Sequence, residues 1–419
     1  MPEKLESLLK QRWLVLVFIS LVIFGCYYAY DSVVPISDSI IKDLGITKAQ
    51  YGLLFSYYSL PNFIMVLLGG ILLDKIGIRK GGTLFAFVCF TGILITAAGP
   101  SFKLMLLGRF LYGIGAESLL VGTVKILTKW FKGKELALAF GLKITLVRLG
   151  NVASLNLGAP IQNWTGSWRM ALWAAVGVML VGLLTYIVYA KFDKAKERAF
   201  EAEGRGGEAG SFVLRDVFKF KRSYWLIVFL CVTFYSVVYP FIAFSNIFLQ
   251  KKFGLSASQG AFYVSLIFFG AMICTPLFGF VIDKIGKRGT FMIVGSFMLI
   301  PIYLTLGLTS FNPAVPMIAI GIAFSLVPAA LWASIPLLVE EKGLGTAFGL
   351  TYMIQNIGLT IFPWLAGRVT DLSGGEYTNT MLMFAFMGVV ALALSIMLKI
   401  SVGKGKEKAL EVPSHKAPA

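Results

Sequence analysis

The stretch "LLGGILLDKIGIRK", residues 67–80, closes a long apolar run with a short basic loop, and the chain contains it twice. The second copy is "LFGFVIDKIGKRG", residues 277–289. Matching positions keep one offset of 209, the distance from 74 to 283, and include Gly70 with Gly279, Asp74 with Asp283, and Arg79 with Arg288. A register kept over this length predicts an internal duplication.

The repeat extends beyond this motif in both directions. Upstream, "LGITKAQYG" from residue 44 matches "FGLSASQGA" from residue 253 at the same offset. Downstream, "ELALAFGL" at 135–142 parallels "GLGTAFGL" at 343–350. We therefore expect the duplicated unit to be half of the chain.

Composition indicates that both halves lie in a membrane. The 419 residues are 57% hydrophobic and only 14% charged, with a mean hydropathy of +0.80. Because soluble domains carry roughly a quarter charged residues, a soluble enzyme is excluded. The four cysteines lie in apolar segments and the single histidine, His415, lies in the tail. We expect no disulfide, metal site or cofactor.

About twelve apolar segments are long enough, at roughly 20 residues, to cross a hydrocarbon layer of about 30 Å. They are expected near 13–37, 49–73, 82–100, 103–127, 136–161, 168–190, 224–249, 259–282, 290–309, 313–339, 345–368 and 378–399. The predicted fold is an all-α membrane protein with two six-helix bundles related by the repeat.

A polar stretch at 191–223 separates the halves and contains nine Lys and Arg residues. The predicted domains are a first bundle at 1–190, a linker at 191–223, a second bundle at 224–400 and a tail at 401–419. The positive-inside rule predicts that both termini and the linker are cytoplasmic. The formal net charge of +17 is then a signal of topology, and we expect no nucleic-acid partner.

The repeated motif lies where an even-numbered span reaches the cytoplasm. Gly70 and Gly279 lack a Cβ and are expected to let two helices approach closely. The aspartate of each copy is expected to cap a neighbouring helix or to pair with the arginine five residues later. A single copy would fit an ordinary charged helix end equally well; two copies in register favour a gating latch.

These motifs resemble those of the major facilitator superfamily. "GGILLDKIGIRK" is similar to that family's loop between the second and third spans, and "GFVIDKIGKR" to its echo between the eighth and ninth. "LLGRFLYGIGAE" resembles its fourth-span motif. The resemblance covers essentially the whole chain. It implies two bundles that rock about a midplane site, as alternating access requires.

Apart from residues at the very ends of spans, such as Arg368, six charged residues fall within the predicted spans, all in the first half: Asp31, Arg109, Glu117, Lys125, Lys143 and Arg148. Each costs about 2.5–3.5 kcal/mol at a span centre, so each is a functional candidate. Arg109 and Lys125 lie near span ends, where snorkelling to the surface is the simpler explanation. The second half would instead supply aromatic and amide groups such as Trp332, Gln355 and Asn356.

Depth matches Glu117 with Arg148, since each lies near the centre of its span. Lys143 would lie about 7.5 Å nearer the cytoplasm at 1.5 Å per residue. Three interpretations remain open. The pair could be a permanent structural ion pair. It could open to bind a zwitterion, the carboxylate taking an ammonium and the guanidinium a carboxylate. Thirdly, Glu117 or Asp31 could carry a proton. Gly113 and Gly115 are expected to thin the helix beside Glu117.

A closer resemblance is to one branch of the superfamily, the lysosomal dipeptide transporters called major facilitator superfamily domain-containing protein 1. The similar stretches are "YGLLFSYYSLPNFIMVLLGG", which contains Tyr58, and "WFKGKELALAFGL", "VRLGN", "AALWASIP" and "IQNIGL". This resemblance implies that Glu117 and Arg148 belong to a dipeptide site and that transport is uniport. Lys125 and Lys143 depart from the animal pattern, which favours acidic peptides or other anions.

We therefore predict an alternating-access transporter of small zwitterionic solutes, most of all dipeptides, and not an enzyme. Its short connectors indicate a prokaryotic relative in the cell membrane. The alternative is a proton-coupled symporter or exchanger of organic anions. We expect a monomer whose partners are its substrate, the bilayer and, in the alternative, protons. The predicted substrate-binding residues are Asp31, Tyr58, Glu117, Lys143, Arg148, Trp332, Gln355 and Asn356.

Overall fold

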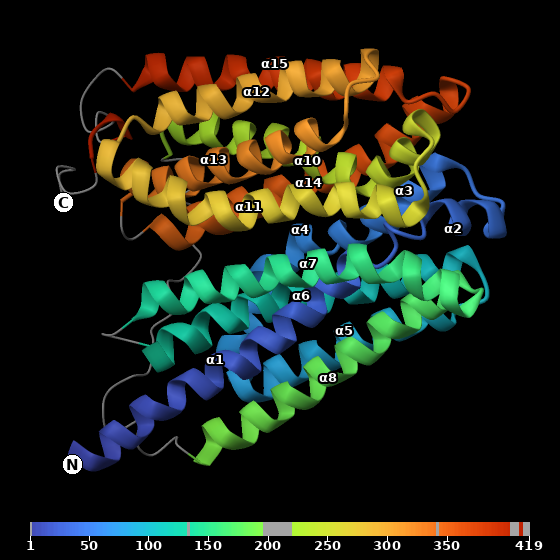
Figure 1. Cartoon of the computed structure of the whole chain (residues 1–419). Helices are drawn as coiled ribbons and strands as arrows, with labels where there is room; N and C mark the ends of the chain where they lie inside the picture. Colours follow the sequence, from blue (N-terminus) through green and yellow to red (C-terminus); the bar gives the residue numbers. More distant parts are fainter. Residues whose placement is uncertain (1, 132–134, 196–219, 341–342, 403–409, 414–419) are drawn as a thin grey trace. The chain divides into compact units, whose positions relative to one another are not determined.

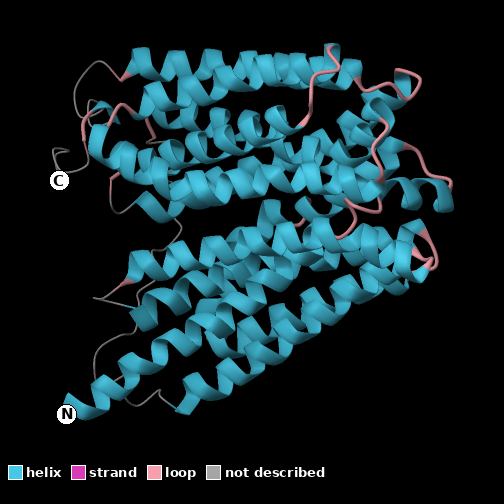
Figure 2. Cartoon of the chain, viewed as in Figure 1, coloured by secondary structure: helices cyan, strands magenta, loops and turns pink. Residues whose placement is uncertain are grey.

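The computed structural model describes residues 2–131, 135–195, 220–340, 343–402 and 410–413. Helices take up nearly all of them (Figure 2), as the composition predicts. Figure 1 labels the helices, whose bounds are α1 Pro2–Asp31, α2 Ser37–Leu44, α3 Lys48–Ser59, α4 Asn62–Ile76, α5 Ile78–Ala98, α6 Phe102–Phe131, α7 Leu136–Thr165, α8 Trp168–Ala195, α10 Arg222–Phe253, α11 Ala257–Ile285, α12 Arg288–Leu308, α13 Ala314–Leu338, α14 Leu344–Leu372 and α15 Thr378–Ser401.

Within the described residues, 11 spans are long and apolar enough to cross a membrane. The helix α14 is not among them, although its 29 residues cover the predicted span at 345–368. Its buried side chains include Thr346, Thr351, Gln355 and Asn356, whose polar groups lower the mean hydropathy. The all-helical membrane fold predicted from the sequence is confirmed.

The predicted second span is divided into two helices. The sequence predicts one segment at 49–73, whereas α3 ends at Ser59 and α4 begins at Asn62. Pro61 lies between them, and a proline has no backbone N–H to continue a helical ladder. A short amphipathic helix, α2, precedes α3 and was not predicted.

Contacts divide the chain into two compact units. Unit 1 comprises residues 1–36 and 60–209, and unit 2 comprises residues 37–59 and 210–419. The break at Pro61 therefore separates α4, which packs on α6 in unit 1, from α3, which packs on α14 in unit 2. Most of the predicted linker, residues 196–219, lies outside the described residues.

Unit 1 depends on close contact between α5 and α6. A Cβ at Gly92 would lie 2.4 Å from the Tyr112 nitrogen, and one at Gly108 would lie 2.6 Å from the Gly92 carbonyl oxygen. Gly115 belongs to the same seam, since its Cβ would lie 2.6 Å from the Phe85 carbonyl oxygen. The expectation that Gly115 leaves room beside Glu117 is therefore wrong; it brings two helix backbones together.

Unit 2 is built around α10, whose neighbours include α14, α15, α11 and α13. Its core is aromatic. The fully buried Phe241 ring on α10 packs edge to face on Tyr303 of α12, with centroids 5.2 Å apart. Elsewhere in the unit, Gly321 of α13 lets α11 approach, because a Cβ there would lie 2.4 Å from the Ile267 carbonyl oxygen.

Candidate functional site

Charged side chains gather inside unit 1, from the end of α1 and from α6 and α7. We call this group the charged cluster, and its members are Asp31, Arg109, Glu117, Lys143 and Arg148. A charge inside a span is expensive unless it is compensated. The contacts of each member therefore indicate what the cluster can do.

Asp31 is the last residue of α1 and is fully buried. Asn151 of α7 donates from Nδ2 to Asp31 Oδ2 over 2.6 Å. The carboxylate also interacts electrostatically with Arg109 and Arg148. Its other oxygen, Oδ1, accepts no hydrogen bond within the described part of the chain. Asp31 thus joins α1, α6 and α7 and keeps one acceptor position.

Arg109 corrects a prediction, because it does not snorkel to a surface. Its side chain is fully buried on α6, and Nη1 donates to the carbonyl oxygens of Ala29 at 3.3 Å and Tyr30 at 3.2 Å. These carbonyls belong to the last turn of α1, where a helix has acceptors without partners and a negative dipole end. The guanidinium donates to these acceptors and its positive charge offsets the negative end of the helix dipole, so a buried position stabilises it.

Glu117 and Lys143 interact electrostatically between α6 and α7. The Lys143 side chain is buried, at 8% exposure, and Glu117 is half-buried. Lys143 is therefore a cation that interacts electrostatically with the glutamate.

Arg148 is half-buried on α7, three residues before Asn151, which places the two on neighbouring helix positions. Its electrostatic partner described above is Asp31. The direct contact between Glu117 and Arg148 stays a prediction. The cluster therefore holds two acids and three cations within one unit.

The first copy of the repeated motif is tied to α6 by Lys125. Its Nζ pairs with Asp74 and donates to the Gly70 carbonyl oxygen over 3.2 Å. Close helix approach occurs one residue before the predicted glycine: a Cβ at Gly69 would lie 2.3 Å from Ser118 Oγ, while one at Gly70 would stay 3.8 Å from Val121. The closest approach to α6 is therefore at Gly69, and the role expected of Gly70 stays a prediction.

The second copy is arranged differently. Asp283 and Arg288 form a long ion pair of 3.8 Å, and Arg288 is only 2% exposed. A Cβ added at Gly279 would meet nothing within 4 Å among the described residues, so the close helix approach there stays a prediction. Arg79, the counterpart of Arg288, is half-buried in the first turn of α5.

In unit 2 the predicted aromatic residue Trp332 lies among other rings. Its Nε1 donates to the Tyr235 hydroxyl over 3.0 Å, and its ring stacks on Tyr352 with centroids 4.4 Å apart. Tyr235 in turn stacks on Tyr239. Tyr352 is 40% exposed, so this cluster presents an aromatic face.

The predicted amide residues lie on α14 and are both buried. Gln355 Oε1 accepts a hydrogen bond from the Cys231 thiol over 3.6 Å. The Asn356 side chain donates from Nδ2 to the Tyr352 carbonyl oxygen over 2.9 Å. Tyr58, also buried, lies on α3 and belongs to unit 2.

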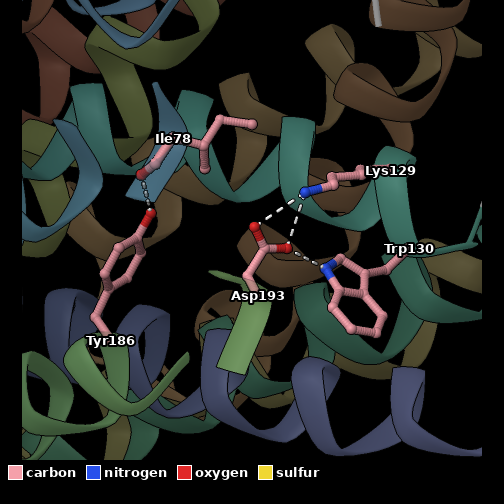
Figure 3. A network of polar contacts seen from close by, with 5 residues as sticks. All are labelled: Ile78, Lys129, Trp130, Tyr186 and Asp193. Atoms are coloured by element: carbon pink, nitrogen blue, oxygen red, sulfur yellow. Dashed lines mark hydrogen bonds and ion pairs between the residues drawn. The ribbon is translucent and has the colours of Figure 1, made fainter. Parts of the chain in front are cut away.

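Sequence reasoning missed a polar network at one end of unit 1 (Figure 3). Both carboxylate oxygens of Asp193 on α8 accept from Lys129 Nζ, at 2.9 and 3.0 Å, and one accepts from Trp130 Nε1 at 2.9 Å. Nearby, the Tyr186 hydroxyl donates to the Ile78 carbonyl oxygen over 2.9 Å. The predicted linker at 191–223 includes Asp193, and the charged residues around it in sequence give no sign that its side chain is buried.

Comparison with known proteins gives one consistent result. The sequence matches the profile of the Major Facilitator Superfamily over residues 16–363 and 241–418. It is 35% identical over 404 residues to the lysosomal dipeptide transporter MFSD1 of Danio rerio, covering 92% of this chain and 87% of that protein. The MFSD1 protein of Homo sapiens is 33% identical over 419 residues, covering 96% of this chain and 88% of that protein.

In structure, the chain resembles a bacterial homologue of the human lysosomal transporter Spinster in an inward-facing, unoccupied conformation. The TM-score is 0.73 at 18% identity, and the match covers 93% of this chain and 97% of the other.

Proposed function

The chain belongs to the Major Facilitator Superfamily of membrane transporters, and we propose that its cargo is a small zwitterion, above all a dipeptide. It is a multi-pass alternating-access transporter and not an enzyme. One observation carries the proposal for the cargo: acids and cations lie together within the apolar spans of unit 1. A dipeptide carries an ammonium and a carboxylate, which need such groups once water is removed.

The proposed roles follow from burial and contacts. Glu117 is only half-buried, and we assign it the ammonium of the peptide. Arg148, also half-buried, takes the carboxylate through its planar guanidinium. Asp31 is fully buried and hydrogen-bonded to Asn151, so it positions Arg148.

Lys143 is assigned a role in selecting the charge of the cargo. It lies beside Glu117, where it would compete with a peptide ammonium and favour a cargo that brings extra negative charge. In unit 2, the aromatic face around Trp332 and the amides Gln355 and Asn356 are proposed contacts for peptide side chains, as is Tyr58.

A thermal-shift experiment tests the site assignment. A ligand at about 100 times its Kd stabilises a folded protein by about 2.7 kcal/mol, so purified protein should melt at higher temperature with dipeptides. Glu117→Gln and Arg148→Ala should fold but lose this shift. Glu376→Gln and Arg169→Ala are matched controls outside the charged cluster and should keep it. Full dipeptide shifts in both cluster variants would refute the assignment.

The second candidate is a proton-coupled carrier of organic anions. Cations outnumber acids in the charged cluster, and Asp31 keeps an oxygen available to a proton. Uptake into liposomes with and without an imposed pH gradient separates the two functions. Equilibration that ignores the gradient supports dipeptide uniport, whereas accumulation driven by an inward proton gradient supports the second candidate.

We also propose that both termini are cytoplasmic, that the protein resides as a monomer in the cell membrane, and that it has no nucleic-acid partner. The distribution of Lys and Arg between the loops supports the orientation. With the four native cysteines replaced, Lys251→Cys should react with an impermeant maleimide in intact cells, whereas Lys284→Cys should react only after the membrane is permeabilised.

A further inference from the structure

A short segment near the C-terminus, residues 410–413, lies against the loop between α11 and α12. We call it the tail segment. Leu410 is fully buried. The Lys287 backbone N–H donates to the Glu411 carbonyl oxygen over 3.2 Å, and Arg288 Nη1 donates to the Val412 carbonyl oxygen over 3.2 Å. The tail segment is thus held by hydrogen bonds to its backbone and by the burial of the Leu410 side chain.

The Glu411 carboxylate also completes the start of α12. Its Oε1 accepts from the Gly289 backbone N–H over 3.1 Å. The first N–H groups of a helix lack internal partners and favour a negative charge. The helix's own N-cap residue, Lys287, provides no side-chain hydrogen bond there. The cap is instead supplied by a residue 122 positions away in the chain.

Among the described residues, the first copy of the motif lacks this arrangement, which is found in unit 2. In unit 1, α5 begins at Ile78. Lys287 is the counterpart of Ile78 in the second copy, but it stays outside α12. Its backbone is left-handed, with φ of 49°, which is unfavourable for a residue with a Cβ. The two copies therefore diverge at the residue whose N–H the tail segment binds.

The motif glycines show the same difference. A Cβ at Gly77 would meet nothing within 4 Å, whereas one at Gly286 would lie 2.3 Å from the Val412 carbonyl carbon. Within the described part of the chain, the second copy is covered and the first is not. Lys399 of α15 adds a further tie to this region, since its Nζ donates to Thr290 Oγ1 over 2.8 Å.

We propose that the loop between α11 and α12 is a binding site for a short aliphatic–acidic–aliphatic peptide segment, occupied by the chain's own Leu410, Glu411 and Val412. The aliphatic side chain of Leu410 anchors the segment. The carboxylate of Glu411 caps α12, and Arg288 holds the backbone that follows. Docking fixes the repeated motif of unit 2 in the conformation described, whereas the motif of unit 1 is fixed by Lys125.

Hydrogen–deuterium exchange on the full-length protein tests this site. Leu410→Asp would bury a charge, and Glu411→Ala removes the cap. Each should raise exchange at the amides of Lys287 and Gly289 by about tenfold or more, because local opening governs exchange. Glu407→Ala removes the same charge from the tail outside the described residues and should leave exchange unchanged. The loop at 77–81 serves as an internal reference.

A second measurement uses the segment as a separate molecule. A chain ending at residue 402 should show the same fast exchange at 286–290, and a synthetic peptide of residues 407–413 should restore protection. The peptide with Glu411→Lys should not. Equal exchange at 286–290 in the intact protein, both point variants and the shortened chain would overturn the proposal, as would equal protection by the two peptides.

Discussion

Single residues show how the membrane interior tolerates the charges of unit 1. Arg109 is fully buried, yet its guanidinium faces the two carbonyls that end α1, the Asp31 carboxylate and the Tyr30 and Tyr112 rings. Sequence position near a span end favoured snorkelling, because nothing in the sequence shows that α1 ends at the same depth. The partner of a buried charge is a property of the tertiary structure.

Arg109→Leu should therefore destabilise the protein strongly. The substitution keeps an apolar stem but leaves two buried carbonyls without their donor and removes one of the two cations that act on the Asp31 carboxylate. Removing one partner of a buried charge network typically costs about 3–5 kcal/mol, so the thermal midpoint should fall well below that of the parent protein. Lys103→Leu, at an exposed position of the same helix, should change it little. Equal midpoints in the two variants would show that Arg109 is not structural.

At the scale of elements, the divided second span is the main feature that the apolar pattern did not reveal. Its α3 half is held in unit 2 by α14: a Cβ at Gly52 would lie 2.3 Å from the Pro363 carbonyl oxygen. Asp371 at the end of α14 accepts from the backbone N–H groups of Lys48 at 3.1 Å and Ala49 at 2.8 Å. One carboxylate thus caps a helix 322 residues away.

Asp371→Ala should loosen the start of α3. Loss of a capping carboxylate costs about 1 kcal/mol, and the Lys48 and Ala49 amides should exchange about fivefold faster, in proportion to that free energy. The Asp38→Ala variant removes a carboxylate that pairs with Lys42 on α2 and acts on the Lys48 side chain only electrostatically, so it should leave those backbone amides unchanged. Unaltered exchange in the Asp371 variant would mean that Thr47 and Gln50, which cap each other, suffice.

For the whole molecule, the duplication and the apolar pattern were enough to predict the helical membrane fold, and the resemblance of the motifs predicted the family. The predicted spans also placed Asp31, Glu117, Lys143 and Arg148 in the first half of the chain. Pairing within the group could not be predicted in the same way, since it depends on helix rotation and crossing. Lys143 with Glu117, and Asp31 with Asn151, emerge only from the packed helices.

The charged cluster contains more cations than acids, which predicts that the transporter prefers acidic cargo. If Lys143 competes with the peptide ammonium for Glu117, acidic dipeptides should be transported faster than basic ones, because like charges repel in a site of low dielectric constant. Lys143→Met should raise uptake of Ala-Lys relative to Ala-Glu by about tenfold, measured as initial rates in liposomes. Lys125→Met is the matched control, since Lys125 pairs with Asp74 outside the charged cluster. A ratio that moves equally in both variants would assign the selectivity to net charge of the unit rather than to Lys143.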